Sequence, residues 1–414
     1  MILFESERSG KLFQKVLELA GIFCASGGRA LLVGGAVRDA LLGRSVKDFD
    51  LEIHNLSADR VKELLQGVCE VDAVGVSFGV IKVKHLELDI SLPRRENKTG
   101  RGHRGFLVEV DPQLSIADAA ARRDFTVNAI MYDPLSDEIL DPHGGVKDLE
   151  KKVLRHVSSH FSEDPLRVLR GMQFAARTGF AFAPETIELC SQISQEELAV
   201  ERIGTEWEKM LLQGKFISRG LDFLKECRWI SFYPELENLS QEEWHKTLLL
   251  LDNCAGVRPE DRQEALLFMS AALVSELSPE HARRFCLRLW NRNELINKIV
   301  ALAAAFGEQC KGAPPDDSGV RRLALRLEGV KQLSLLLQAA GLEEKAAGIA
   351  EKAHRYGLWQ AAPKPLLTGK HGIKLGVKPG KELGILMKQC FEAQLDGLFF
   401  TEEEGIAYLE TLLS

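Results

Sequence analysis

The segment from Leu31 to Ile53 restricts the fold of this chain more than any other part of the sequence. A short apolar run leads into Gly34 and Gly35, a helix-like stretch ends at Gly43, and a second strand-like run follows. Glycines let backbone N–H groups approach a phosphate closely, and the N-terminus of the next helix adds partial positive charge. A plain strand-to-helix turn is the simpler interpretation of two adjacent glycines. The segment therefore predicts a strand, a glycine turn, a helix and a strand, with phosphate binding as one use of the turn.

The second strand of this segment carries carboxylates at alternating positions. Because strand side chains alternate between faces, we expect Asp48, Asp50 and Glu52 on one face. Neighbouring carboxylates repel one another, so the cluster is costly unless a cation binds there, and oxygen ligands with space for water and phosphate favour Mg²⁺. The run 87–92 alternates again and makes Asp89 a candidate third ligand. An exposed acidic strand edge is the alternative, but it does not explain the glycine turn.

The pattern of apolar residues changes near residue 150. Strand-like runs at 30–33, 49–53, 80–83 and 86–92 alternate with helix-like stretches, whereas apolar residues at helical spacing dominate afterwards. We therefore predict an α+β fold, with a mixed sheet and helices in the N-terminal part and an all-α remainder. Loop signals lie at 312–317 and 361–365.

The composition excludes several classes of protein. The chain has 414 residues, of which 45% are hydrophobic, and this is enough for two or three domains. Its eight cysteines include no CxxC pair, so their spacing indicates neither a zinc site nor a disulfide framework. Early charges and the lack of a long apolar run predict no secretory signal and no membrane span, which makes the cytoplasm the expected location. A net charge of -7 does not exclude RNA, because a polyanion needs only one basic face.

Four further motifs follow the acidic strand in order. They are RRDFTVNAI at 122–130, DPHGGVKDL at 141–149, EDPLR at 163–167 and ERIGTE at 201–206. Together with the glycine turn and the acidic strand, they resemble the motif series of the class II tRNA nucleotidyltransferase and poly(A) polymerase family, within the DNA polymerase beta superfamily. The resemblance covers roughly the first half of the chain.

The resemblance implies an enzyme that adds CCA to the 3′ end of tRNA without a template, using CTP and ATP. Asp48 and Asp50 would hold two Mg²⁺ ions that align the RNA 3′-hydroxyl with the α-phosphate. The nucleotide would be bound by Gly34, Gly35, Arg38, Arg122, Arg123, Asp124 and Asn128, with Asp124 facing the ribose hydroxyls. An ordinary solvated charge run is the alternative for the RRD motif.

The EDPLR motif is the candidate for base selection. Proline in the first turn after Ser162 indicates a helix start, which would place Asp164 and Arg167 on one side of that helix. An acceptor beside a forked donor can bind the edge of a base, and in the family these positions distinguish cytosine and adenine. An intrahelical salt bridge is the alternative. By the same resemblance, ERIGTE supports the pocket from behind.

Two basic segments are candidate RNA contacts. The stretch 94–106 is a basic, glycine-containing loop that includes Arg101 and Arg104, and the family uses a flexible loop here to switch from cytosine to adenine. Near the C-terminus, Lys370, Lys374 and Lys378 could meet the tRNA backbone. Solvated surface is the alternative for both segments.

The resemblance also divides the chain into domains. It implies a catalytic head at 1–150, a neck with the base-selecting motif at 151–225, a body at 226–312 and a tRNA-contacting tail at 313–414. The body is similar, more weakly, to a histidine-aspartate phosphohydrolase domain, but Met269 and Ser270 stand where its metal-binding doublet is expected, so His245 is left alone. We therefore expect no phosphohydrolase activity.

Several alternatives for function remain open. An A-adding tRNA nucleotidyltransferase and a bacterial poly(A) polymerase share the motifs described above. A metal phosphohydrolase and an inactive RNA-binding protein fit the sequence less well, since the first lacks its doublet and the second should have lost Asp48 or Asp50. The oligomeric state does not follow from the sequence.

Overall fold

The fold is taken from a computed structural model that describes Phe4 and residues 10–72, 80–98, 106–195 and 198–414. The chain forms two compact units. Unit 1 consists of Met1–Glu206 and Arg219–Phe232, and unit 2 consists of Trp207–Ser218 and Tyr233–Ser414. The predicted boundaries at 150, 225 and 312 do not coincide with the limits of these units. The two units do not test a division into four domains, which therefore stays a prediction.

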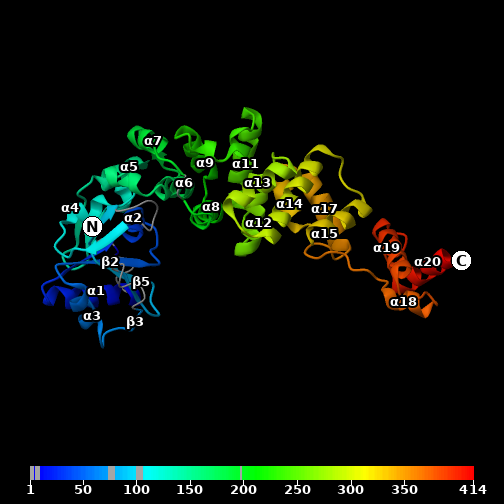
Figure 1. The fold of residues 1–414 in the computed structure, drawn as a ribbon, viewed down its shortest axis with the longest axis horizontal. Coiled ribbons are helices and arrows are strands. Elements are labelled where there is room, and N and C mark those ends of the chain that lie inside the picture. Colours follow the sequence, from blue (N-terminus) through cyan, green and yellow to red (C-terminus); the bar gives the residue numbers. More distant parts are fainter. Residues whose placement is uncertain (1–3, 5–9, 73–79, 99–105, 196–197) are drawn as a thin grey trace. The chain divides into compact units, whose positions relative to one another are not determined.

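Unit 1 is built on a seven-stranded mixed sheet with the strand order β3-β4-β5-β2-β1-β8-β9 (Figure 1). β2 and β5 run parallel, whereas the other neighbouring strands run antiparallel. The strands are β1 Arg29–Val33, β2 Phe49–His54, β3 Val71–Asp72, β4 Val80–Val83, β5 Leu88–Ser91, β8 Met131–Asp133 and β9 Glu138–Leu140. The sheet together with the helices confirms the predicted α+β class, and β1, β2, β4 and β5 lie where strand-like runs were expected.

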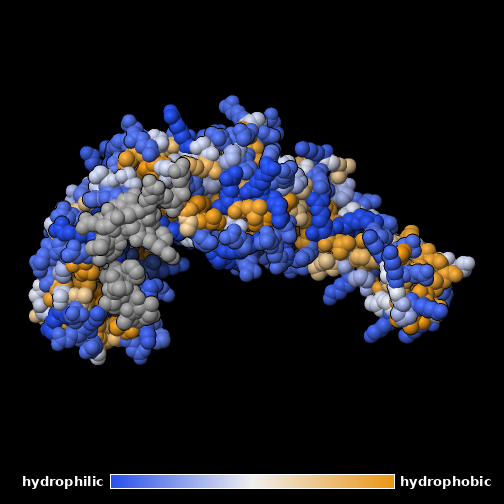
Figure 2. Space-filling model, viewed as in Figure 1, coloured by the Kyte–Doolittle hydropathy of each residue, from blue (hydrophilic) through white to orange (hydrophobic). Residues whose placement is uncertain are grey.

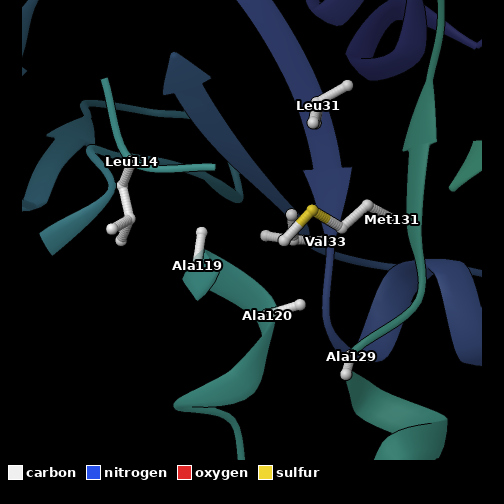
Figure 3. Close-up of a cluster of buried hydrophobic side chains, with 7 residues drawn as sticks. All are labelled: Leu31, Val33, Leu114, Ala119, Ala120, Ala129 and Met131. Carbon is white, nitrogen blue, oxygen red and sulfur yellow. The ribbon is translucent and has the colours of Figure 1, made fainter. Parts of the chain in front are cut away.

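One face of the sheet packs against α4, Ile116–Ala121. Leu31 and Val33 of β1 and Met131 of β8 form a buried cluster with residues in and beside α4, and Figure 3 shows Met131 next to Val33. Each fully buried aliphatic side chain of this kind contributes roughly 1.5–3 kcal/mol to folding. Ser115 caps α4 by accepting a hydrogen bond of 3.1 Å from the backbone N–H of Asp118. This packing fixes the end of α4, where the RRD motif begins, beside the glycine turn that follows β1.

The first helix, α1 Lys11–Ala25, contacts β1 and lies beside α3 Ala58–Leu65 (Figure 1). Its Phe13 ring lies 5.7 Å from the Phe49 ring of β2, measured between centroids, and both side chains are buried. Phe49 therefore faces the helical core, so the alternation of β2 turns Asp50 away from it.

The rest of unit 1 extends the sheet domain with short strands and helices. Gly145, at the start of α5, leaves no space for a side chain, because a Cβ there would collide with the backbone oxygen of Thr126. The Phe182 and Phe223 rings stack with centroids 3.6 Å apart and tie the segments that carry them together. The remaining elements are α2 Gly35–Leu41, η3 Thr126–Asn128, α5 Gly145–Lys151, β10 Val153–Leu154, η4 Ser159–Glu163, α6 Leu166–Thr178, β11 Ala181–Phe182, α7 Pro184–Ser191 and η5 Trp229–Phe232.

The basic segment 94–106 differs from its prediction as a loop. Its first part is β6, Arg94–Lys98, which pairs antiparallel with β7, Phe106–Val110, in a two-stranded sheet of its own. The glycines and charges of the segment suggested a loop, but strand pairing depends on a partner further along the chain. Here Lys98 pairs with Phe106 and Arg94 pairs with Val110. Arg101 and Arg104 lie outside the described residues, so their predicted RNA contact stays a prediction.

Unit 2 is helical in the part of the chain that the structure describes. α8 Val200–Gln213 and α9 Ile217–Glu226 cross the division between the units. The indole of Trp207 is fully buried and donates a hydrogen bond of 3.0 Å to the Tyr233 hydroxyl. The other helices are α10 Pro234–Glu237, α11 Gln241–Gly256, α12 Arg262–Leu273, α13 Pro279–Leu289, α14 Asn293–Lys311, α15 Asp317–Leu327, α16 Lys331–Ala339, α17 Glu343–Arg355, α18 Gly369–Lys374, α19 Lys381–Asp396 and α20 Glu402–Leu413. The predicted loop at 361–365 falls between helices, and the one at 312–317 does so up to Asp316, because Asp317 begins α15.

The last three helices form a small core of their own around Leu367, Cys390 and Phe399. Figure 2 shows apolar surface over these helices. Arg321 of α15 joins them to the rest of unit 2, because its guanidinium lies over the Phe400 ring at 5.3 Å and donates to the Leu395 carbonyl at 2.9 Å. The exposed apolar residues in this part are Ile373, Ile385, Leu398, Phe400, Leu412 and Leu413.

Candidate active site

The glycine turn after β1 is conformationally restricted to glycine. Gly34 has φ +74° and ψ -133°, a combination that side chains of L-residues rarely adopt. A Cβ on Gly34 would lie 3.3 Å from Nη1 of Arg123 and 3.6 Å from Oδ2 of Asp50. The turn therefore brings the backbone of Gly34 into close contact with one cation and one carboxylate of the predicted site.

A cluster of carboxylates lies at the beginning of β2 and β5. The register of these parallel strands places Asp50 directly beside Asp89, and Asp48 immediately precedes β2. Partial burial of the Asp50 carboxylate raises its pKa, and the negative charges of Asp89, Asp48 and Glu52 raise it further, while Arg123 acts in the opposite direction. Asp89 also lies 3.8 Å from Lys82 Nζ. The carboxylates predicted from the strand patterns thus share one electrostatic environment that favours a cation.

Glu52 lies on the same strand but is fully buried, whereas Asp48 is exposed and Asp50 is partly accessible to solvent. Its Oε1 lies 3.2 Å from His54 Nε2, and its Oε2 lies 3.6 Å from Arg123 Nη2. Burial alone would raise the Glu52 pKa, but His54 and Arg123 hold it below the ordinary value. Glu52 therefore positions Arg123 at the site, and its own carboxylate is already engaged by His54 and Arg123.

A chain of buried polar contacts connects the helix after the glycine turn to the RRD motif. Arg38 is buried, and its Nη1 donates to Asn128 Oδ1 at 2.6 Å. Asn128 in turn donates to Asp124 Oδ1 at 2.9 Å. Arg170 of α6 donates to Asp124 Oδ2 through Nε at 2.8 Å and lies 2.7 Å from it through Nη2. Arg38 and Asn128 are consequently held in place by Asp124 and by its partner on α6.

The Asp124 carboxylate is almost fully engaged in this network. Besides Asn128 and Arg170, the backbone N–H of Phe125 donates to Oδ1 at 2.8 Å. Burial alone would raise the Asp124 pKa, but the charge of Arg170 and these hydrogen bonds lower it. A carboxylate has about four acceptor positions, so a ribose hydroxyl could bind Asp124 only if one of the present donors gave way.

The helix that carries the base-selecting motif begins later along the chain than predicted. Ser162 lies in η4, Pro165 is the N-cap of α6, and the helix starts at Leu166. Asp164 has an extended backbone, because a following proline disfavours the helical conformation. The prediction that Asp164 is part of the helix was therefore wrong. Its carboxylate caps α6 from outside by accepting a hydrogen bond of 3.1 Å from the Leu166 N–H.

Arg167 and Asp164 are each held by residues of other elements. The Arg167 guanidinium donates to the carbonyl oxygens of His160 and Arg122, at 2.7 Å in both cases. Arg202 of α8, within the ERIGTE motif, donates to Asp164 Oδ2 at 2.9 Å. The motif at 201–206 thus holds the Asp164 side chain in place, which agrees with its predicted role as a support of the pocket.

The DPHGGVKDL motif stabilises the RRD segment through a side-chain hydrogen bond. Asp141 accepts hydrogen bonds from the backbone N–H groups of Gly145 and Val146, at 2.7 and 2.9 Å, which caps α5. Asp148 of that helix accepts a hydrogen bond of 2.8 Å from Thr126 Oγ1. Thr126 lies between Asp124 and Asn128, so the motif is structural.

Comparisons with known proteins agree with this arrangement. A family model described as the poly A polymerase head domain matches residues 30–155. A CCA-adding enzyme of Alteromonas mediterranea is 35% identical over 303 residues, which are 66% of this chain and 75% of that protein. The chain belongs to the tRNA nucleotidyltransferase and poly(A) polymerase family. The predicted resemblance is confirmed.

Two further relatives of the family define the extent of the match. A multifunctional CCA protein of Xylella fastidiosa is 41% identical over 190 residues, which are 44% of this chain and 44% of that protein. The chain therefore matches less than half the length of this relative. The crystal structure of the Bacillus stearothermophilus CCA-adding enzyme in complex with CTP has a TM-score of 0.74 at 24% identity, covering 97% of this chain and 98% of that one. At this identity the likeness establishes the fold.

Sequence patterns missed Arg170, and they located Arg202 within the predicted supporting motif without predicting its partner. Arg170 holds Asp124, and Arg202 holds Asp164, across 46 and 38 residues of chain. Arg170 follows Arg167 by three positions and so lies on a similar side of α6, which is the one local signal that could have pointed to it. The roles assigned to the site residues stay predictions.

The remaining predicted contacts lie on the surface of unit 2. Lys370, Lys374 and Lys378 are exposed, the first two on α18 and the third just after it. Within the described ranges, no three His, Cys, Asp or Glu side chains gather closely enough to form a metal site by themselves. Among the helices that the structure describes, none is both long and apolar enough to cross a membrane.

Proposed function

We propose that this protein adds CCA to the 3′ end of tRNA without a nucleic-acid template, using CTP and ATP and releasing pyrophosphate. The observation that supports this most strongly is the placement of Asp50 beside both Asp89 and the backbone of Gly34. A carboxylate pair next to a glycine turn can place a metal-bound triphosphate against the strand edge. The reaction is the transfer of a nucleotidyl group to the RNA 3′-hydroxyl.

The carboxylates fit Mg²⁺ as the cofactor. Asp48 is exposed and Asp50 is partly accessible to solvent. Partial burial and the charges of Asp89, Asp48 and Glu52 raise the Asp50 pKa, so a cation would relieve the repulsion. Two carboxylates leave coordination positions for water and phosphate oxygens, which is how Mg²⁺ is usually held. When bound, Mg²⁺ would activate the attacking hydroxyl and neutralise charge on the phosphate. Asp89 is the proposed third carboxylate.

The chain's own residues would bind the nucleotide and choose its base. Arg123, held by Glu52 beside Gly34, and Arg38 are the cations nearest the turn that would meet the phosphates. Asp164 and Arg167 would read the base edge through the acceptor and donor groups that remain on their side chains. Their present partners, Arg202 and the carbonyl of Arg122, would fix the two side chains at the spacing that reading a base requires.

Related activities share this machinery and differ in product. An A-adding enzyme would use ATP alone on ends that already carry CC, and a poly(A) polymerase would make long adenosine tracts. We further propose Lys370, Lys374 and Lys378, all of which are exposed, as contacts to the tRNA backbone, and the cytoplasm as the place of reaction.

The reaction class can be tested with the purified full chain, labelled CTP and tRNA lacking CCA. We expect incorporation that needs a divalent cation, is lost in Asp48→Ala and Asp50→Ala, and persists in the matched control Asp59→Ala, which changes an exposed aspartate of α3. Retained incorporation in Asp50→Ala would contradict the metal-ligand assignment. Release of phosphate from a 2′,3′-cyclic nucleotide by the wild type would favour a phosphohydrolase instead.

A further inference from the structure

A group of arginines gathers around one phenylalanine of α6, beside the candidate active site. Arg170, Phe174 and Arg177 are spaced by four and three residues, so their side chains share one face of α6. The Phe174 ring is buried, and the guanidinium carbons of Arg170 and Arg177 lie 5.6 and 5.8 Å from its centroid. Arg38 of α2 approaches the same ring at 5.3 Å. Three guanidiniums therefore surround one aromatic ring.

Arg177 differs from the other two arginines because it lacks a carboxylate partner. Arg38 is paired with Asp39, with 2.9 Å between Nη2 and Oδ2, and Arg170 is paired with Asp124. Each of these two positive charges is therefore offset by an adjacent carboxylate. Within the part of the chain that the structure describes, no carboxylate forms an ion pair with Arg177.

The guanidinium of Arg177 has hydrogen-bond donors to spare. The side chain is half-buried, and Nη1 donates to Gln173 Oε1 at 3.3 Å. Nε and Nη2 have no hydrogen-bond partner among the described residues and are not enclosed by protein atoms, so both are open to solvent. Guanidinium donors match the oxygens of a phosphate group. Arg177 can therefore bind such a group without giving up a present contact.

The charges that face Arg177 come from α2, from the residues after α2 and from α8. Burial lowers the pKa of the Arg177 guanidinium, and the positive charges of Arg38 and Arg44 lower it further. Asp39 and Glu206 act in the opposite direction. Arg44 is exposed and forms no ion pair within the described ranges. Three cations against two carboxylates leave one positive charge in excess, and an anion would relieve the repulsion among the arginines.

Arg38 connects this group to the glycine turn. A Cβ on Gly35, the first residue of α2, would lie 3.6 Å from Nη2 of Arg38. At the other end of α2, the backbone N–H of Arg44 donates to the Asp39 carbonyl at 2.9 Å, which holds Arg44 next to the helix. A phosphate group next to those proposed for the turn would therefore meet Arg177.

We propose that Arg177, together with Arg44, binds a phosphate group beyond those held at the glycine turn. The phosphate can belong to the triphosphate of the incoming nucleotide or to the RNA backbone near its 3′ end, and both ligands rest on the proposed function. The two open donors of Arg177 would bind phosphate oxygens, and Arg44 would add a second positive charge from the solvent side. Arg177 would thus contact the substrate as well as pack on Phe174.

The nucleotide as the source is tested by isothermal titration calorimetry of CTP and CMP on the full chain, with Mg²⁺ and without RNA. Arg177→Gln removes the charge, and Arg60→Gln is the matched control, because it removes the same charge from an exposed pair on α3. If the phosphate belongs to the nucleotide, Arg177→Gln should weaken CTP binding about tenfold. Binding of CMP, which lacks the outer phosphates, should not change. Arg177→Lys, which keeps a charge without the fork, should lose less.

The RNA as the source is tested by the anisotropy of labelled tRNA lacking CCA at several salt concentrations. If the phosphate belongs to the RNA backbone, Arg177→Gln should weaken tRNA binding and leave CTP binding unchanged. The slope of the logarithm of the binding constant against the logarithm of the salt concentration should fall by about 0.7, the value for one contact to a single strand. Arg60→Gln should bind tRNA like the wild type.

Arg44→Gln is a second test that does not depend on a half-buried side chain, because Arg44 is exposed. It should weaken binding of the same ligand as Arg177→Gln, about twofold, and it decides the matter if Arg177→Gln does not fold. If the folded variants bind CTP and tRNA like the wild type, the proposal is wrong. An equal loss of CTP and CMP binding with unchanged tRNA binding would also contradict it. The proposed function fails separately, if the wild type binds these ligands but does not incorporate CTP.

Discussion

The Nη2 atom of Arg167 donates a hydrogen bond of 2.7 Å to the carbonyl oxygen of Arg122. This contact joins the candidate base-selecting motif to the first residue of the RRD motif, although 45 residues separate them along the chain. The same guanidinium donates to the His160 carbonyl through Nη1. The proposed selection of the base and the proposed binding of the nucleotide would therefore both depend on one forked side chain.

Arg167→Lys should reduce base discrimination, because a single ammonium cannot reproduce the fork that bridges the two carbonyls. We expect the ratio of CTP to UTP incorporation, measured as kcat/KM, to fall about tenfold for each charged hydrogen bond lost. Arg60→Lys, in an exposed ion pair with Glu63 on α3, is the matched control and should leave the ratio unchanged. An unaltered ratio in Arg167→Lys would remove Arg167 from base selection.

Gly34→Ala should lower activity through the site geometry as well as through backbone strain. The positive φ costs an alanine roughly 1–3 kcal/mol, and its Cβ would press on Arg123 and Asp50. Gly43→Ala is a matched control, because Gly43 also has a positive φ, +66°, but a Cβ there would meet no atom within 4 Å. Denaturant unfolding should show a loss of stability in both variants, and CTP incorporation should fall strongly in Gly34→Ala alone. Equal activities would contradict the close contact at the turn.

Asp50 should give the protein a pH-dependent stability in the absence of metal. The folded-state pKa of Asp50 is raised above the ordinary value. Its contribution to the free energy of unfolding is therefore present below the ordinary pKa of an aspartate and is lost as the pH rises through the raised pKa. Urea unfolding in EDTA should therefore show Asp50→Asn gaining stability relative to the wild type as the pH rises. Added Mg²⁺ should restore stability to the wild type and have less effect on the variant.

The same protonation should limit activity at acidic pH, because a protonated Asp50 cannot bind the metal. CTP incorporation should rise with pH through the raised pKa. Asp59→Asn, at an exposed position, is the control for general charge effects and should follow the wild type. A pH-independent stability difference between the wild type and Asp50→Asn would contradict the electrostatic account of the acidic cluster.

Arg170→Ala should destabilise unit 1 by about 3–5 kcal/mol at neutral pH, because it leaves the buried Asp124 carboxylate without its cation. The lowered pKa of Asp124 means that its stabilising contribution is present above the ordinary aspartate pKa and is lost as the pH falls through the folded-state pKa. The difference in unfolding free energy between variant and wild type should therefore shrink in acid. Arg60→Ala, which breaks an exposed pair, should cost less than about 1 kcal/mol. A cost for Arg170→Ala as small as this would contradict the anchoring role.

Local patterns were sufficient to predict the strands that carry the site. Alternation of apolar and acidic residues located β2 and β5, and the two glycines located the turn that follows β1. Asp164 was misplaced because the proline was assigned to the first helical turn, whereas its effect on the preceding residue excludes Asp164 from the helix. The pattern also predicted the face of Glu52 but not its burial under Arg123.

Long-range contacts account for what the sequence could not predict. Arg202 reaches Asp164 from a helix 38 residues later, and no periodicity relates the two positions. The hairpin of β6 and β7 likewise depends on the pairing of Arg94 with Val110, and its charged, glycine-containing sequence alone indicated a loop. Tertiary structure decides both cases.

Sequencing the 3′ ends made by the full chain on tRNA lacking CCA, in the presence of both CTP and ATP, is the most direct test of the proposed function. We predict that the added nucleotides are CCA and that addition then stops, with CTP alone giving CC and ATP alone extending only ends that already carry CC. Long adenosine tracts, or no incorporation of CTP on any end, would contradict the account.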